Sequence, residues 1–188
     1  LKSLYCLHGD EPLLIQEAAD TIRATARLQG YTERTVHTVA GAHYDWSEVL
    51  ASGGSMSLFA DRQLIEIQIP SGKPGVDGAK ALEAYAARLP ADTLTLISLP
   101  GLDWKAMQSR WFAALANQGV VVEARPIDRV ALPRWIERRL AKQGLRAERA
   151  ALEFLADQVE GNLLAAQQEI DKLALLLPPG SVTLADVE

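Results

Sequence analysis

The first residues that could carry chemistry lie where a short apolar run near the amino terminus meets Gly9 and the acidic turn Asp10-Glu11-Pro12. A strand, a glycine turn and a helix form the unit that cradles phosphates in nucleotide-binding proteins. The working pattern is Gly-x-x-x-x-Gly-Lys-Ser/Thr, in which lysine neutralises the phosphates and the hydroxyl binds Mg²⁺. Here the lysine, the second glycine and the hydroxyl are missing, and no carboxylate pair follows the apolar run 93–99. The sequence therefore argues against ATP hydrolysis.

Other catalytic arrangements are no better supported. The histidines, His8, His37 and His43, have no metal-ligand spacing with one another or with carboxylates, so we expect surface or hydrogen-bonded side chains. Serines occur without a Gly-x-Ser-x-Gly elbow. Asp10 and Glu11 suit the start of a helix, where the dipole favours negative charge, better than an acid/base pair. We expect no catalytic residues, no cofactor and no metal.

One stretch has the composition of a binding element. Residues 53–60 read Gly-Gly-Ser-Met-Ser-Leu-Phe-Ala, so that Met56, Leu58 and Phe59 stand where a loop is normally polar. The paired glycines, Gly53 and Gly54, give the backbone freedom. Apolar side chains on a loop either fold back into the core or meet a partner, and the stretch alone leaves both readings open.

Composition excludes several classes of protein. Of the 188 residues, 48% are hydrophobic and 23% charged, which is typical of a globular protein rather than of a disordered one. No apolar run is long enough to span a bilayer, and no secretory signal opens the chain, so we expect a cytoplasmic protein. Cys6 is the single cysteine, so it cannot form an internal disulfide, and its apolar surroundings predict a buried thiol.

The net charge of -5 excludes a protein that attracts nucleic acid over its whole surface. The charge is unevenly distributed, however, because residues 129–149 carry a local charge of +5. The cations are Arg129, Arg134, Arg138, Arg139, Lys142, Arg146 and Arg149, against Glu137 and Glu148. This run could contact DNA or an acidic subunit face, or it could be a solvated helix face.

Periodicity predicts alternating strands and helices over residues 1–125. The expected order is strand 4–7, helix 12–28, strand 35–39, short helix 45–50, strand 63–69, loop 70–78, helix 82–89, strand 93–99, one helix 103–119 and strand 120–122. Such alternation favours a doubly wound parallel α/β sheet with right-handed crossovers.

Residues 126–188 are predicted to form a separate, purely helical domain. Three short helices are expected, from Pro133 to Gly144, over residues 152–159 and over residues 163–177. Thr183 and Asp186 then suit the first turn of a further helix, so we expect another domain beyond residue 188. A parallel sheet followed by a small helical lid is the layout of the AAA+ (P-loop NTPase) fold, here without a functional phosphate loop.

Three stretches together resemble the delta subunit family of the bacterial DNA polymerase III clamp loader. They are Leu-His-Gly-Asp-Glu-Pro-Leu-Leu-Ile-Gln-Glu at 7–17, Met-Ser-Leu-Phe-Ala-Asp-Arg-Gln at 56–63, and Glu-Gly-Asn-Leu-Leu-Ala-Ala-Gln-Gln-Glu-Ile-Asp-Lys-Leu at 160–173. They follow one another in the family's order and span nearly the whole chain. The absent phosphate loop agrees, since the family uses an AAA+ frame that does not hydrolyse ATP.

The resemblance implies a role in DNA replication for named residues. Leu58 and Phe59 would enter an apolar pocket on the beta sliding clamp, with Met56 beside them and with Arg62 and Gln63 as polar rim contacts. The subunit would open the clamp ring for loading onto primed DNA, as a noncatalytic part of the polymerase holoenzyme. Its other partners would be the gamma/tau and delta-prime subunits, bound through a collar domain after residue 188, and primer-template DNA through the complex.

Two alternatives stay open at this point. An ATP-hydrolysing AAA+ motor would need the missing lysine and hydroxyl of the phosphate loop. Another inactive scaffold, such as the delta-prime stator, would resemble the motors in carrying zinc-binding cysteines and a Ser-Arg-Cys motif. The single cysteine, Cys6, is preceded by Tyr5 and fits neither feature.

Overall fold

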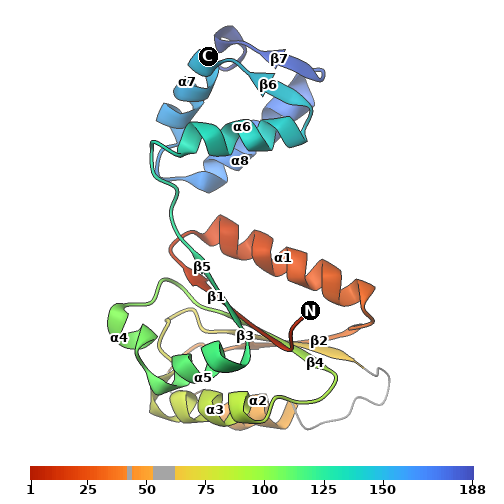
Figure 1. The fold of residues 1–188 in the computed structure, drawn as a ribbon, viewed down its shortest axis with the longest axis vertical. Coiled ribbons are helices and arrows are strands. Elements are labelled where there is room, and N and C mark those ends of the chain that lie inside the picture. The colour runs from red at the N-terminus through yellow and green to blue at the C-terminus, as the bar shows by residue number, and fades with distance from the viewer. Residues whose placement is uncertain (42–43, 53–61) are drawn as a thin grey trace. The chain divides into compact units, whose positions relative to one another are not determined.

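The computed structural model describes residues 1–41, 44–52 and 62–188. The chain divides into two compact units, Leu1–Arg125 and Pro126–Glu188, and each is described by itself (Figure 1).

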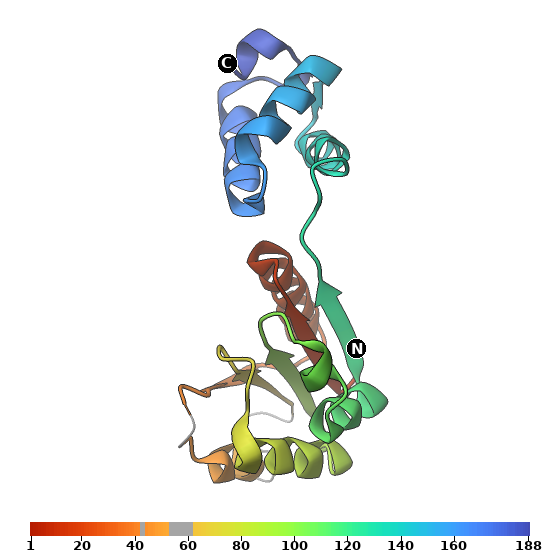
Figure 2. The same cartoon turned by 90° about the vertical axis from the view of Figure 1, so that its left-hand side faces the viewer.

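The first unit is built on a five-stranded, wholly parallel sheet in the order β2-β3-β4-β1-β5. Its strands are β1 (Leu4–Gly9), β2 (Glu33–Thr38), β3 (Gln63–Gln68), β4 (Thr93–Ser98) and β5 (Val120–Ala124). Helix α1 (Pro12–Leu28) covers one face, and α2 (Trp46–Ser52), α3 (Gly75–Ala87) and α5 (Arg110–Gln118) cover the other (Figures 1 and 2). The predicted α/β class and parallel sheet are confirmed.

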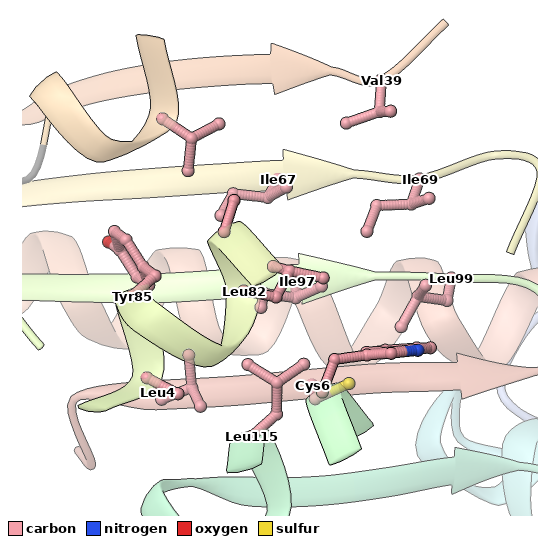
Figure 3. Close-up of a cluster of buried hydrophobic side chains, with 14 of the residues drawn as sticks. Leu4, Cys6, Val39, Ile67, Ile69, Leu82, Tyr85, Ile97, Leu99 and Leu115 are labelled. Carbon is pink, nitrogen blue, oxygen red and sulfur yellow. The ribbon is translucent and has the colours of Figure 1, made fainter. Parts of the chain in front are cut away.

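The core lies on both faces of the sheet, because successive side chains of a strand point to opposite sides. Leu4 and Cys6 of β1 join the larger cluster under α3 and α5, together with Ile67, Ile97 and other residues labelled in Figure 3. Leu7 of the same strand joins the smaller cluster under α1. The predicted burial of Cys6 is confirmed, and burial raises the pKa of its thiol to about 12.

The predicted strand over residues 63–69 is present as β3, and one of its polar side chains is buried. Glu66 is 1% exposed on the face under α1. Its two carboxylate oxygens accept hydrogen bonds from Arg23 of α1 at 2.9 and 2.8 Å and from Arg34 of β2 at 2.6 and 3.2 Å. Burial alone would raise the pKa of Glu66, but the two guanidinium groups outweigh it and hold the pKa at about 2.

The predicted loop 70–78 extends too far, because helix α3 already begins at Gly75. Gly78 lies inside this helix, where a Cβ would stand 2.5 Å from the ring of Trp46 in α2. This glycine therefore permits close helix packing rather than a loop.

A single helix over 103–119 is also wrong, because the structure has two. The side chain of Asp103 caps α4 (Trp104–Met107) by accepting from the amide of Ala106 at 2.7 Å. Ser109 then caps α5, accepting from the amide of Phe112 at 3.4 Å. A serine that can satisfy free amides restarts the helix after one turn.

The second unit contains the three predicted helices, α6 (Leu132–Lys142), α7 (Arg149–Val159) and α8 (Leu163–Leu176). The expectation of helices alone is wrong, because β6 (Leu145–Ala147) and β7 (Gly180–Val182) pair in parallel. These three-residue strands are too short to show periodicity, yet they bury Leu145 and Val182. The chain then enters a 3-10 turn, η1 (Leu184–Asp186), with the expected reciprocal cap between Thr183 and Asp186.

Candidate functional site

The apolar side chains predicted to bind a partner, Met56, Leu58 and Phe59, lie outside the described residues. The structure describes the residues on either side of this segment, Ser52 at the end of α2 and Arg62 before β3. Since all strands of the sheet are parallel, the start of β3 lies at the edge opposite to the turn that follows β1. The start of β3, which follows the predicted binding segment in the sequence, and the phosphate-loop position therefore lie at opposite edges of one sheet.

Gln63, predicted as a rim contact, makes hydrogen bonds within the fold. Its Nε2 donates to the backbone oxygen of Ser52 at 3.1 Å and to Oγ1 of Thr93 at 3.3 Å. The Oγ of Ser52 also lies 2.9 Å from Nε2 of His37, whose Nδ1 lies 3.0 Å from the hydroxyl of Tyr44. These bonds hold the end of α2 against the starts of β3 and β4.

Arg62, the other predicted rim contact, lies against the end of α1. Its Nη1 donates to the backbone oxygen of Gln29 at 2.8 Å, and its guanidinium lies 5.6 Å from the ring centre of Tyr31. A longer ion pair joins its Nε to Asp92 at 3.9 Å. The side chain stays 47% exposed, so that it is anchored and still reachable by a partner.

At the opposite edge, the phosphate-loop position is filled by the chain's own carboxylates. Glu11 is buried as the N-cap of α1, and its Oε1 accepts from the amide of Leu13 at 3.3 Å. Asp10 lies over Gly101 so closely that a Cβ there would stand 2.0 Å from the carboxylate oxygen Oδ1. Two carboxylates at a helix start repel an anionic ligand, so this geometry disfavours a nucleotide phosphate.

The burial of His8 was not predicted from the sequence. It is 3% exposed, its ring meets Phe112 edge to face at 5.4 Å, and its Nδ1 has no hydrogen-bond partner in the described part of the chain. Burial lowers the pKa of His8, and the carboxylates of Glu123 and Asp10 offset this only in part. Its position at the end of an apolar central strand was the available signal. His37 is hydrogen-bonded as expected, and His43 lies outside the described residues.

Within residues 1–41, 44–52 and 62–188, no three His, Cys, Asp or Glu side chains are grouped so that they could hold a metal ion. No helix in these ranges is long and apolar enough to cross a membrane.

The four cations predicted to contact DNA or a subunit differ in their surroundings. Arg134, Arg138 and Lys142 are exposed on α6. Arg139 is half-buried, with its guanidinium 4.1 Å from the ring centre of Trp135 and its Nη1 donating to Gln167 at 2.5 Å.

The family model described as DNA polymerase III, delta subunit, matches residues 5–125, which is more than half of the chain. The chain belongs to the DNA polymerase III delta subunit family. The resemblance drawn from the three sequence stretches is thereby confirmed, and the match covers the unit that carries both edges described above.

Two curated relatives in this delta family are similar to the chain over nearly its whole length. The delta subunit of Escherichia coli K12 is 34% identical over 188 residues, which are 100% of this chain and 54% of that protein. The delta subunit of Haemophilus influenzae is 31% identical over 182 residues, 95% of this chain and 52% of that protein. The chain therefore spans about half the length of the curated relatives that it matches.

Solved structures confirm the fold. A Bacillus subtilis DNA clamp loader delta protein matches 100% of this chain and 57% of its own with a TM-score of 0.72 at 22% identity. A RuvB protein of Thermotoga maritima matches 97% of this chain and 59% of its own with a TM-score of 0.58 at 16% identity. The predicted AAA+-like architecture is thus confirmed for this delta-family chain.

Proposed function

We propose that this delta-family chain binds the beta sliding clamp through Leu58 and Phe59, with Met56 as a flanking contact, and opens the clamp ring for loading onto primed DNA. The observation that carries the proposal is the apolar segment between α2 and β3 in a chain of the delta family. Its start and end points, Ser52 and Gln63, are hydrogen-bonded to each other.

Binding energy would come mainly from the two large apolar side chains. Leu58 and Phe59, fully buried in a pocket, would contribute about 1.5–3 kcal/mol each, as anchor residues of a hot spot do. The bonds of Gln63 and Arg62 fix the end of the segment, which reduces the entropy that binding must remove. To open the ring, the chain must bind the open or strained clamp more tightly than the closed one, because only differential affinity shifts that equilibrium.

The chain would do this without hydrolysing ATP. This part of the proposal is supported by the capping carboxylate of Glu11 and by Asp10 close to Gly101, which put negative charge at the turn after β1 and disfavour a phosphate there. Energy for cycling would then come from partner subunits, for which we propose the gamma/tau and delta-prime subunits of the loader, acting on primer-template DNA. The cations Arg134, Arg138, Arg139 and Lys142 are the candidate contacts to DNA or to a subunit.

The test is the double substitution Leu58→Ala with Phe59→Ala, with clamp affinity measured by surface plasmon resonance. We expect at least about a 100-fold loss, the equivalent of two buried anchors. The matched control is Leu175→Ala with Leu176→Ala, two leucines that are exposed on α8 and should be neutral. Unchanged clamp affinity in a folded Leu58/Phe59 double variant would overturn the proposal.

A further inference from the structure

The helix α6 presents a line of three cations to solvent. Arg134, Arg138 and Lys142 recur every four residues and are exposed, and we call them the basic stripe. The residues that α6 buries, Leu132, Ile136 and Leu140, have the same spacing but are offset by two positions. Two positions correspond to about 200° around a helix, so the basic stripe lies directly opposite the buried side. Successive cations are about 6 Å apart along the axis.

The stripe is left unpaired although carboxylates are plentiful. The second unit has eight Lys and Arg against ten Asp and Glu. Arg129 pairs with Glu153 and Asp157, and Lys172 pairs with Glu169. The three stripe side chains, in contrast, make no ion pair or hydrogen bond with any of the described residues. Their charge is therefore available to a partner.

The stripe lies on a helix that is fixed in place. Arg139, next to the stripe, stacks on Trp135 and donates to Gln167 of α8. Gln167 in turn donates to Asp171 at 2.8 Å. Arg139 thus ties α6 to α8, and its role differs from that of the exposed cations beside it.

The chemistry of this face fits a polyanion better than a protein. Protein interfaces centre on apolar and aromatic anchors and are depleted in lysine. No large apolar side chain of α6 is exposed, and Glu137 is its one acidic residue. A row of cations at regular spacing instead matches the repeating charge of a nucleic-acid backbone. We infer that the basic stripe binds the phosphodiester backbone of DNA without regard to sequence. This inference does not depend on clamp binding by Leu58 and Phe59.

The experiment compares two triple variants in the full-length chain, assembled with its clamp-loader partners. The test variant replaces the stripe (Arg134→Gln, Arg138→Gln, Lys142→Gln). The control variant removes the same charge from exposed or paired positions in the same unit (Arg129→Gln, Arg149→Gln, Lys172→Gln). The probe is a fluorescein-labelled primer-template DNA, whose binding is followed by anisotropy between about 50 and 200 mM salt, the range over which phosphate contacts make affinity strongly salt-dependent.

We expect the stripe variant to bind at least about tenfold more weakly at 0.1 M salt, with a salt slope that is smaller by about 2 to 3, because each lost phosphate contact removes about 0.9 from the slope. The control variant should bind within about twofold of the wild type. Equal weakening by both triples would overturn the inference in favour of net charge alone. Unchanged DNA binding would overturn the inference, because the basic stripe would then face only solvent. Unchanged DNA binding together with a loss of subunit assembly would overturn it in favour of an acidic protein partner. Clamp affinity, measured in parallel, should be unchanged in both variants.

Discussion

The two edges of the parallel sheet are built in opposite ways. At the carboxyl edge, Gly9 packs against Ala124, the cap Glu11 is buried, and His8 is enclosed beside Phe112. At the amino edge, the fold is held by polar bonds of the half-buried Gln63 and the exposed Arg62. The first edge is packed with the chain's own groups, whereas the second holds the ends of an apolar segment.

The contrast matters because of where sheets of this kind bind ligands. Open parallel sheets bind ligands beyond the carboxyl ends of their strands, where loops and helix starts converge. In this delta-family chain that position is filled by Asp10 and Glu11. The residues proposed to bind the clamp precede β3, whose start lies at the other edge, so the proposed binding does not require the carboxyl edge to be open.

The largest effect on stability is expected from adding a side chain at the closely packed carboxyl edge. Gly9 has a φ of +146°, and a Cβ there would stand 2.1 Å from the backbone oxygen of Ala124. Gly9→Ala should therefore lower the free energy of unfolding by about 4 kcal/mol, from overpacking and backbone strain combined. Urea denaturation measures this loss.

The control for that variant is Gly30→Ala. Gly30 also has a positive φ, of +86°, but nothing lies within 4 Å of a Cβ there. It should cost only about 1 kcal/mol, the strain alone. Equal losses at the two glycines would mean that the carboxyl edge is not tightly closed.

Much of this architecture follows from patterns that the sequence displays. The helix Pro12–Leu28 has the predicted bounds, because Pro12, the apolar spacing and Gly30 act locally. The two helices after Asp103 and the early start of α3 depend on Ser109 as a cap and on Gly78 against Trp46. Ser109 is a local capping signal that competes with the continuous apolar spacing, whereas the contact of Gly78 with Trp46 is tertiary and leaves no local pattern.

A second, smaller effect is expected in the middle of the sheet, between the two edges. Glu66→Gln leaves Arg23, whose side chain is 16% exposed, with only the exposed Asp20 as a negative partner, so the free energy of unfolding at pH 7 should fall by about 3 kcal/mol. The pKa of Glu66 is lowered from 4.5 to about 2 in the folded chain, so its contribution is complete above pH 4.5 and is lost as the pH falls towards 2.

Urea denaturation of the wild type and of Glu66→Gln at several pH values between 7 and 2 checks this sign. The difference between them should shrink steadily below about pH 4.5. A difference that stays constant or grows on acidification would show that the carboxylate is not held ionised by Arg23 and Arg34.

The candidate site was predictable in part. The types and order of Met56, Leu58 and Phe59 distinguish the segment from an ordinary loop. The match to the delta family supports the proposal that this segment binds the clamp. The partners of Gln63 and Arg62 could not be predicted, because Ser52, Thr93, Gln29 and Tyr31 are brought together by the sheet and by the end of α1. Hydrogen bonds between segments distant in sequence leave no local pattern.

A still smaller effect tests whether those bonds at the amino edge support clamp binding. Gln63→Ala removes the bonds to Ser52 and Thr93 and should cost about 1 kcal/mol of stability, with a loss of clamp affinity of about fivefold. Gln68→Ala is the matched control, because Gln68 lies at the far end of the same strand and accepts from Thr38 at 3.3 Å. Its clamp affinity should equal that of the wild type.

Thr93→Val separates an internal tie from direct contact with the clamp. Thr93 is 3% exposed, so it cannot reach a partner, yet its hydroxyl is one of the two acceptors for Gln63. If Gln63 acts by holding the end of the segment, Thr93→Val should reproduce part of the affinity loss, about twofold, in surface plasmon resonance against the clamp. If Gln63→Ala weakens binding and Thr93→Val does not, Gln63 touches the clamp itself, and the amino edge contributes a polar contact as well as a support.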